Sequence, residues 1–124
     1  MGKNVSLLRR LTASASHLDA VQLRDEVEQR ACVPLRDCAA GTYVQVVGRL
    51  KAVVYTPSET VPTLEAELFD GYDSLELVWL GRRRIAGLEP GRRVVVRGRV
   101  GEHNGRKAIY NPWYELLQPT HDRT

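Results

Sequence analysis

The sequence predicts an all-β domain with a small helical content, in which five antiparallel strands close into a barrel and one amphipathic helix packs against it. Three observations lead to this fold class. From residue 42 onward, apolar residues recur with the period of two that half-buried strands have. The dipeptides Asp70-Gly71 and Asn104-Gly105 mark tight turns between alternating segments. The length of 124 residues suits a single domain of this kind.

Residues 17–31 carry the clear helical pattern of the chain. Leu23 and Val27 recur four residues apart on one side, and Pro34 ends the helix. Because only one side is apolar, this helix needs a surface to pack against. We expect it to lie outside the strands and to cover one open end of the barrel. Residues 1–34 are accordingly predicted to form an N-terminal helical extension.

The first strand is predicted over residues 43–55, with Gly48 near its middle. A long alternating strand with an interior glycine indicates a strand that bends sharply, as strands of small barrels do. The even-numbered residues are expected to face inward: Val44, Val46, Gly48, Leu50, Ala52 and Val54. The odd-numbered residues are expected to face outward: Gln45, Val47, Arg49, Lys51, Val53 and Tyr55.

Four further strands are predicted over residues 63–69, 74–80, 93–100 and 106–117. A short connector over residues 82–88 joins the third to the fourth, and we expect a bulge at Asn111-Pro112 to interrupt the last. Alternation again selects the inward set, which includes Trp79 by its parity: Leu64, Ala66, Leu68, Leu75, Leu77, Trp79, Val94, Val96, Gly98 and Val100.

The order of these elements matches the five-stranded Greek-key OB fold: a long bent strand, a hairpin, a connector and a closing hairpin. Closure of the strands hides the sheet edges that a small antiparallel sheet would otherwise expose. An SH3-like barrel has a similar strand count, but its strands are shorter. We expect the OB domain to span residues 35–118 and residues 119–124 to form a disordered tail.

Six short segments also carry a family resemblance; they begin at Gly41, Pro62, Leu77, Gly87, Val96 and Asn111. Together they resemble the OB-fold wedge domain of RecG-type branch-migration helicases, and also small free-standing bacterial OB-fold nucleic-acid-binding proteins. The similarity covers about residues 35–118 and consists of turns, glycines and inward apolar positions. It implies a module that contacts DNA or RNA without acting on it chemically. It favours DNA over RNA, with a DNA-repair or replication protein as a partner.

Charge is polarised along the chain. The net charge is +3, but residues 82–107 hold nine basic residues against Glu89 and Glu102, a local excess of +7. Residues 59–76 hold six acids and no base. Such an arrangement indicates a directional electrostatic surface, whose basic side would attract phosphates. Alternatively, the acidic strands simply pair with basic neighbours on a solvent-exposed sheet face, and the charge pattern does not mark a binding surface.

OB modules bind nucleic-acid strands with a basic groove and stacking aromatic rings. The acids Glu65, Glu67 and Glu76 would repel phosphates from the second and third strands, so the binding path is predicted to run near the connector and the fourth strand. Tyr43 is expected to pack or to lie in a loop. The predicted nucleic-acid contacts are Arg49, Lys51, Tyr55, Arg82, Arg83, Arg84, Arg97, Arg99, Arg106, Lys107, Tyr110 and Trp113.

The sequence lacks the motifs of common enzymes, including the Gly-x-Ser-x-Gly and H-E-x-x-H patterns and the phosphate-binding loop of helicase motors. Cys32 and Cys38 lack the further ligands of a zinc site, so neither a metal nor another cofactor is expected. Apolar runs are too short for a membrane span or a signal peptide, which predicts a cytoplasmic protein.

The resulting hypothesis is a non-catalytic, cytoplasmic, nucleic-acid-binding OB module for single-stranded or branched DNA, with RNA possible. The alternative is an adaptor that uses the same fold to bind an acidic protein partner through its arginines. The oligomeric state is left open.

Overall fold

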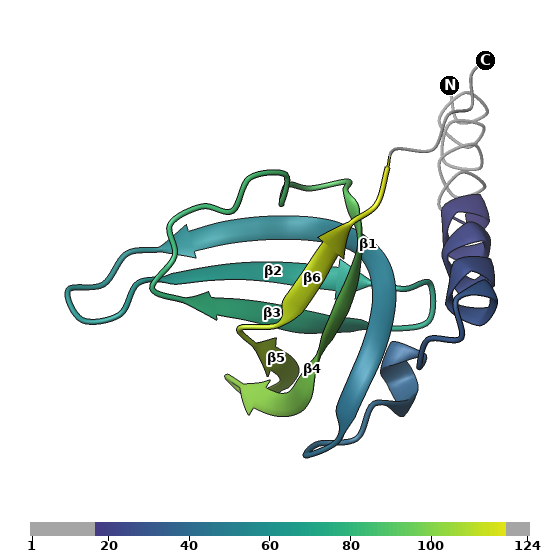
Figure 1. Ribbon diagram of the computed structural model, residues 1–124, viewed down its shortest axis with the longest axis horizontal. Coiled ribbons are helices and arrows are strands. Elements are labelled where there is room, and N and C mark those ends of the chain that lie inside the picture. The colour runs from purple at the N-terminus through teal and green to yellow at the C-terminus, as the bar shows by residue number, and fades with distance from the viewer. Residues whose placement is uncertain (1–16, 119–124) are drawn as a thin grey trace, which may run out of the picture.

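The computed structural model describes residues 17–118 and contains a helix over residues 17–29, a short 3₁₀ helix and six strands (Figure 1). The 3₁₀ helix is η1 (Leu35–Asp37). The strands are β1 (Tyr43–Thr56), β2 (Thr63–Phe69), β3 (Ser74–Leu80), β4 (Arg93–His103), β5 (Arg106–Tyr110) and β6 (Trp113–Leu116). Within the described residues, no helix is both long and apolar enough to cross a membrane.

The strands follow the order β1-β2-β3-β5-β4-β6, and β1 pairs with β4 as well, so the sheet closes on itself as a ring. The first half of β1 pairs with β4 and its second half pairs with β2. These pairings confirm the predicted fold class. One pairing differs from the antiparallel expectation, because β5 returns from the β4 hairpin in the same direction as β3 and pairs with it in parallel.

Gly48 allows β1 to pass from one partner to the other. At the next residue, Arg49, the strand pairs with both Arg93 of β4 and Phe69 of β2. A Cβ atom on Gly48 would lie 2.5 Å from the carbonyl oxygen of Phe69. Only a residue without a side chain permits this approach, so the bend that the sequence indicates is located here.

A bulge at Lys51 makes the prediction for the end of β1 wrong. Leu50 pairs with Leu68 and Ala52 pairs with Glu67, so the residue between them has no partner. One extra residue reverses the alternation beyond it. The predicted inward Val54 is therefore 54% exposed, and the predicted outward residues Val53 and Tyr55 pack against the core.

The ring encloses the main core, which the predicted inward residues of the other strands supply. Leu68 and Val96 are fully buried in it, and Trp79 is only 4% exposed. Leu35 and Cys38, at η1, and Ile85 and Leu88, from the connector, join the same cluster. These residues, rather than the N-terminal helix, extend the core beyond the strands.

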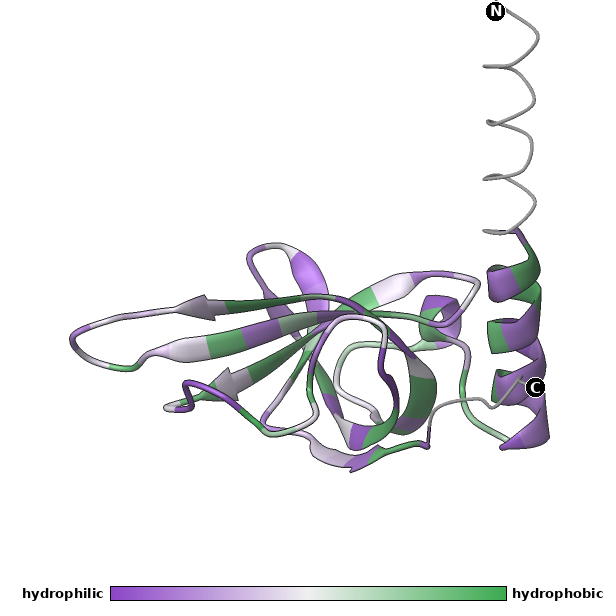
Figure 2. Ribbon diagram, turned by 90° about the horizontal axis from the view of Figure 1, so that it is seen from above, coloured by the Kyte–Doolittle hydropathy of each residue, from purple (hydrophilic) through white to green (hydrophobic). Residues whose placement is uncertain are grey.

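The helix over residues 17–29 packs beside the ring and does not cover its end, contrary to the prediction (Figures 1 and 2). Val27 forms a second apolar cluster with Val47 of β1, Val95 of β4 and Leu117. The two strand valines face outward from the ring, as their parity predicts. Because outward valines need cover from water, they fix the position of the helix.

The interruption of the last predicted strand is a break and not a bulge. Asn111 adopts a left-handed backbone conformation with φ 49°. Its N–H donates to the carbonyl oxygen of Val78 over 2.7 Å, and its Oδ1 accepts the N–H of Leu80 over 3.0 Å. The chain turns at Asn111. Before the turn it runs along β3 as β5, and after the turn it pairs with β4 as β6.

Candidate functional site

Three of the predicted binding cations are engaged by acids of the protein itself. Arg49 donates to Asp19 Oδ1 over 2.9 Å and to the Gly91 carbonyl over 2.8 Å. The ammonium of Lys51 lies 3.7 Å from the same aspartate. Arg106 lies 3.4 Å from Glu76 Oε2. These contacts use the positive charge within the fold.

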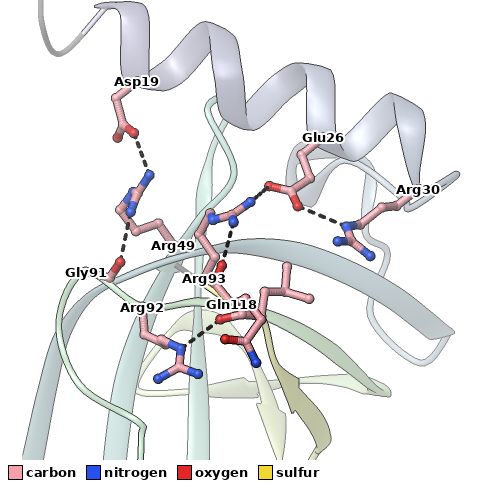
Figure 3. A network of polar contacts seen from close by, with 9 residues as sticks. Asp19, Glu26, Arg30, Arg49, Gly91, Arg92, Arg93 and Gln118 are labelled. Carbon is pink, nitrogen blue, oxygen red and sulfur yellow. Dashed lines mark hydrogen bonds and ion pairs between the residues drawn. The ribbon is translucent and has the colours of Figure 1, made fainter. Parts of the chain in front are cut away.

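Figure 3 shows that Arg49 belongs to a polar network that fastens the helix to the ring. Glu26 accepts hydrogen bonds from Arg30 over 2.9 Å and from Arg93 over 2.7 Å. Burial alone would raise the pKa of Glu26, but the two hydrogen bonds and the nearby charges outweigh burial and leave this pKa below its ordinary value. A hollow beside this network is lined by several of its members, among them Glu26, Arg49 and Arg93, so we assign the hollow a structural role.

The connector holds Arg82, Arg83 and Arg84 as exposed side chains that follow β3. Arg83 lies 6.0 Å from the ring centre of Tyr55, which is half-buried against the core. Residues 17–118 supply no acidic ion-pair partner for any of the three arginines. Their charge is available to a ligand or to another molecule.

A second group, which includes the predicted contacts Arg97, Arg99 and Trp113, gathers on the outer face of β1, β4 and β6. The strand register places Tyr43 opposite Arg99, and Arg97 between Gln45 and Trp113. We call these five residues the cation–aromatic strip. The helix covers Val47 and Val95 on the same face, so the strip occupies the part that the helix leaves open.

Arg97 and Trp113 form the centre of the strip. The guanidinium carbon of Arg97 lies 4.3 Å from the ring centre of Trp113, and its Nε donates to Gln45 Oε1 over 2.7 Å. Trp113 is nevertheless 46% exposed. An arginine held in place by an amide and stacked on an exposed indole offers a planar cationic surface next to an aromatic one.

Arg99 and Tyr43 extend the strip toward the start of β1. Arg99 Nη1 donates to the Gly41 carbonyl over 2.6 Å and its side chain remains exposed. Tyr43 is 65% exposed, so the expectation that it packs or lies in a loop is wrong. Its odd position in β1, opposite an outward arginine, was the signal that could have identified it.

Two predicted residues lie away from the strip. Tyr110 donates its hydroxyl hydrogen to the Glu102 carbonyl over 3.2 Å. It must therefore accept from His103 Nδ1, which lies 2.8 Å from the same oxygen. The ammonium of Lys107 lies 3.5 Å from the Arg36 carbonyl.

The outer face of β2 and β3 is acidic, as the sequence predicts. Glu67 lies directly opposite Glu76, and Glu65 Oε2 lies 3.6 Å from His103 Nε2. Ligand atoms of Glu65, Glu76 and His103 all lie within 4.8 Å of one another, so these side chains could hold a divalent cation. Arg106 would compete with a cation for Glu76.

The two cysteines lie elsewhere and are both buried and free. Burial raises the pKa of the Cys32 thiol, and raises that of Cys38 to about 11. Both side chains are therefore neutral thiols at physiological pH. Cys32 lies in the chain segment that follows the helix. Its Sγ accepts a hydrogen bond from Gln45 Nε2 over 3.7 Å and so helps to hold the Gln45 side chain of the strip.

Comparison with known proteins identifies the fold. The chain matches RecG bound to a three-way DNA junction with 24% identity and a TM-score of 0.58, over 68% of this chain and 12% of RecG. It matches the OB domain of Ta0387 from Thermoplasma acidophilum with 18% identity and a TM-score of 0.58, over 74% of this chain and 92% of that domain. The HINb domain of p204 matches with 14% identity and a TM-score of 0.55, over 73% of this chain and 49% of that one.

These likenesses define the chain as an OB-fold protein, and its fold resembles that of the OB domain in RecG. The resemblance predicted from the sequence is confirmed at the level of the fold. No protein-family model matches the chain, and no curated protein matches its sequence.

Proposed function

We propose that this chain is a non-catalytic nucleic-acid-binding module that holds single-stranded DNA, or the single-stranded part of a branched DNA, on the cation–aromatic strip. The observation that carries the proposal is the stack of Arg97 on the exposed ring of Trp113, with Arg99 and Tyr43 beside it. The likeness to RecG in complex with a DNA junction supports nucleic acid as the ligand and favours DNA over RNA.

The chemistry of the strip suits an unpaired strand. Exposed indole and phenol rings bind bases by stacking, which requires bases that are not already stacked in a duplex. Arg97 and Arg99 would neutralise phosphates beside those rings. A repair or replication protein that exposes single strands is the class of partner that such a module would serve.

The other predicted basic contacts differ in how much they are expected to contribute to binding. The connector arginines Arg82, Arg83 and Arg84 have no acidic partner within the described residues and would add phosphate contacts. Arg49, Lys51 and Arg106 are engaged in ion pairs. The proposal does not depend on these three, because breaking an ion pair offsets the gain from a phosphate contact.

Fluorescence anisotropy with a labelled mixed-sequence single strand of DNA tests whether the Trp113 ring stacks on a base. Trp113→Ala should weaken binding by about 1–3 kcal/mol, the usual loss for one stacked base. A duplex of the same sequence should bind more weakly, and an RNA strand tests the preference for DNA. The melting temperature of the variant must match the parent. A folded Trp113→Ala protein that binds as tightly as the parent would contradict the proposal.

A pair of charge variants locates the site. Arg97→Gln with Arg99→Gln removes two charges from the strip, and Arg82→Gln with Arg84→Gln removes two from the connector. Equal net charge makes each double variant the control for the other. We expect the greater loss of affinity for the strip variant. If the parent binds no single-stranded or forked DNA at low salt, the adaptor that binds an acidic protein becomes the better hypothesis.

A further inference from the structure

The outer face of β2 and β3 has acids in its first two rows, exposed apolar side chains from the second row onward and basic residues just beyond its other end. The register gives the order along the strands. Glu67 lies opposite Glu76 in the first row, and Glu65 lies between Val54 and Val78 in the next. Thr63 lies opposite Leu80 in the last row, after which the chain enters the basic connector. We call this surface the β2–β3 face.

The acidic end of the face lacks sufficient positive charge. Carboxylates directly opposite each other on neighbouring strands repel. Glu76 Oε1 is buried without a hydrogen-bond partner, while Arg106 approaches only the other oxygen. Within residues 17–118 no cationic group forms an ion pair with Glu67. A cationic group from outside the chain would relieve this repulsion.

The middle of the face exposes large apolar side chains. Val54 is 54% exposed, Leu80 42% and Tyr110 40%. The N–H of Gly81 donates to the Pro62 carbonyl over 2.7 Å, which brings the loop with Val61, itself 49% exposed, next to Leu80. Clustered apolar exposure of this kind marks interaction surfaces in soluble proteins.

The basic end consists of Arg82, Arg83 and Arg84, which follow Leu80 after a single glycine. Each is exposed, and none has an acidic partner among the residues that the structure describes. The same chain therefore carries unpaired charge of both signs, on either side of one apolar patch. Glu76 and Leu80 lie about 13 Å apart along β3 at the rise of a strand, and the chain turns at Gly81, φ 76°, before it reaches Arg82.

We propose that a second copy of this chain docks on the β2–β3 face to form a two-fold symmetric dimer. A two-fold axis near the exposed Leu80, beside the buried Val78, places the connector of each copy against the acidic end of the other. The apolar side chains meet on the axis, and the two charge clusters form on either side of it. A second copy fits better than an unrelated partner because this chain itself supplies both halves of the charge pattern.

The cation–aromatic strip lies on β1, β4 and β6, so the dimer leaves it accessible. This inference therefore goes beyond the proposed function, and it is tested without nucleic acid. Sedimentation velocity of nuclease-treated, nucleic-acid-free protein in EDTA, from about 1 to about 200 µM, should show a monomer–dimer equilibrium. A parent protein that sediments as a monomer over the whole range would overturn the dimer.

Charge reversal distinguishes this interface from any other. Arg82→Glu with Arg84→Glu makes both ends of the face acidic, and Glu67→Lys with Glu76→Lys makes both ends basic. Each variant alone should lose self-association by ~10-fold or more, because like charges then meet. An equimolar mixture should associate again, since one copy is acidic and the other basic at both clusters.

The control reverses two exposed acids of the helix, Asp25→Lys with Glu28→Lys, which changes the net charge as the Glu67–Glu76 pair does. It should associate as the parent does. Because Glu76 is largely buried, Glu67→Lys alone serves as the basic variant if the double variant does not fold. Folded reversal variants that stay monomeric when mixed, or a control that dissociates equally, would refute the assignment of the β2–β3 face.

Discussion

At the scale of single residues, Asp70 has the most demanding environment in the described part of the chain. Its side chain is fully buried. One carboxylate oxygen accepts the Leu35 N–H over 2.7 Å, and the other accepts the N–H groups of Tyr72 and Asp73 over 2.9 Å each. The residue thus shapes the β2–β3 turn and also ties η1 to it. The sequence predicts the turn, but not the bond to a residue 35 positions earlier.

Asp70→Asn should therefore destabilise the domain. The amide keeps the shape of the side chain but replaces one acceptor oxygen with a donor, which opposes a backbone N–H. We expect the free energy of unfolding in urea to fall by about 1–3 kcal/mol, the cost of an unsatisfied buried group. Asp73→Asn, at an exposed position in the same turn, is the control. Equal effects of the two substitutions would contradict the role of Asp70.

At the scale of elements, the N-terminal helix depends on both its apolar stripe and its charges. Val27 contacts the outward valines of the ring, while Glu26 holds two arginines beside it. The pKa of Glu26 in the folded chain is lower than its ordinary value of 4.5. Its contribution to stability is complete above the unfolded pKa and is lost as the pH falls through the folded pKa.

Glu26→Gln should cost about 1–3 kcal/mol of unfolding free energy at neutral pH, as loss of charged hydrogen bonds does. The difference from the parent should narrow as the pH falls below 4.5, because the parent carboxylate then becomes protonated as well. Urea unfolding at several pH values measures both effects. Glu28→Gln, on the exposed side of the same helix, is the control; a Glu26 effect independent of pH would disprove the electrostatic account.

Sequence patterns predicted the elements best where alternation was undisturbed. Leu68 and Val96 are inward as expected, because nothing interrupts the period of two in their strands. The prediction that Tyr55 faces outward is wrong, because the bulge that reverses the alternation before it cannot be recognised from the residue types of the strand. Arg49 was predicted as a free cation because its partner, Asp19, lies in another element and meets it only after folding. The stacking of Arg97 on Trp113 likewise depends on a strand pairing that spacing alone does not reveal.

At the scale of the whole molecule, the affinity for nucleic acid should fall only moderately as the salt concentration rises, because few phosphates are contacted. A strip of this size, with help from the connector, would contact about three to five phosphates, so log K should fall with log salt with a slope of roughly −2 to −3.5. Arg97→Gln with Arg99→Gln should flatten the slope, and Trp113→Ala should preserve it, because stacking releases no counterions. Titrations at several salt concentrations measure this. A slope unchanged by the arginine substitutions would place the phosphates elsewhere.

The double pairing of β1 also has a consequence for how quickly the chain folds. β2 with β3 and β4 with β5 are local hairpins, which form with little loss of chain entropy. Tyr43, by contrast, pairs with Arg99, so the ring closes only when segments more than fifty residues apart meet. This non-local step places the domain among topologies that fold in milliseconds to seconds. The helix docks on Val47 of β1 and Val95 of β4 together, so its docking surface forms only when these two strands have paired.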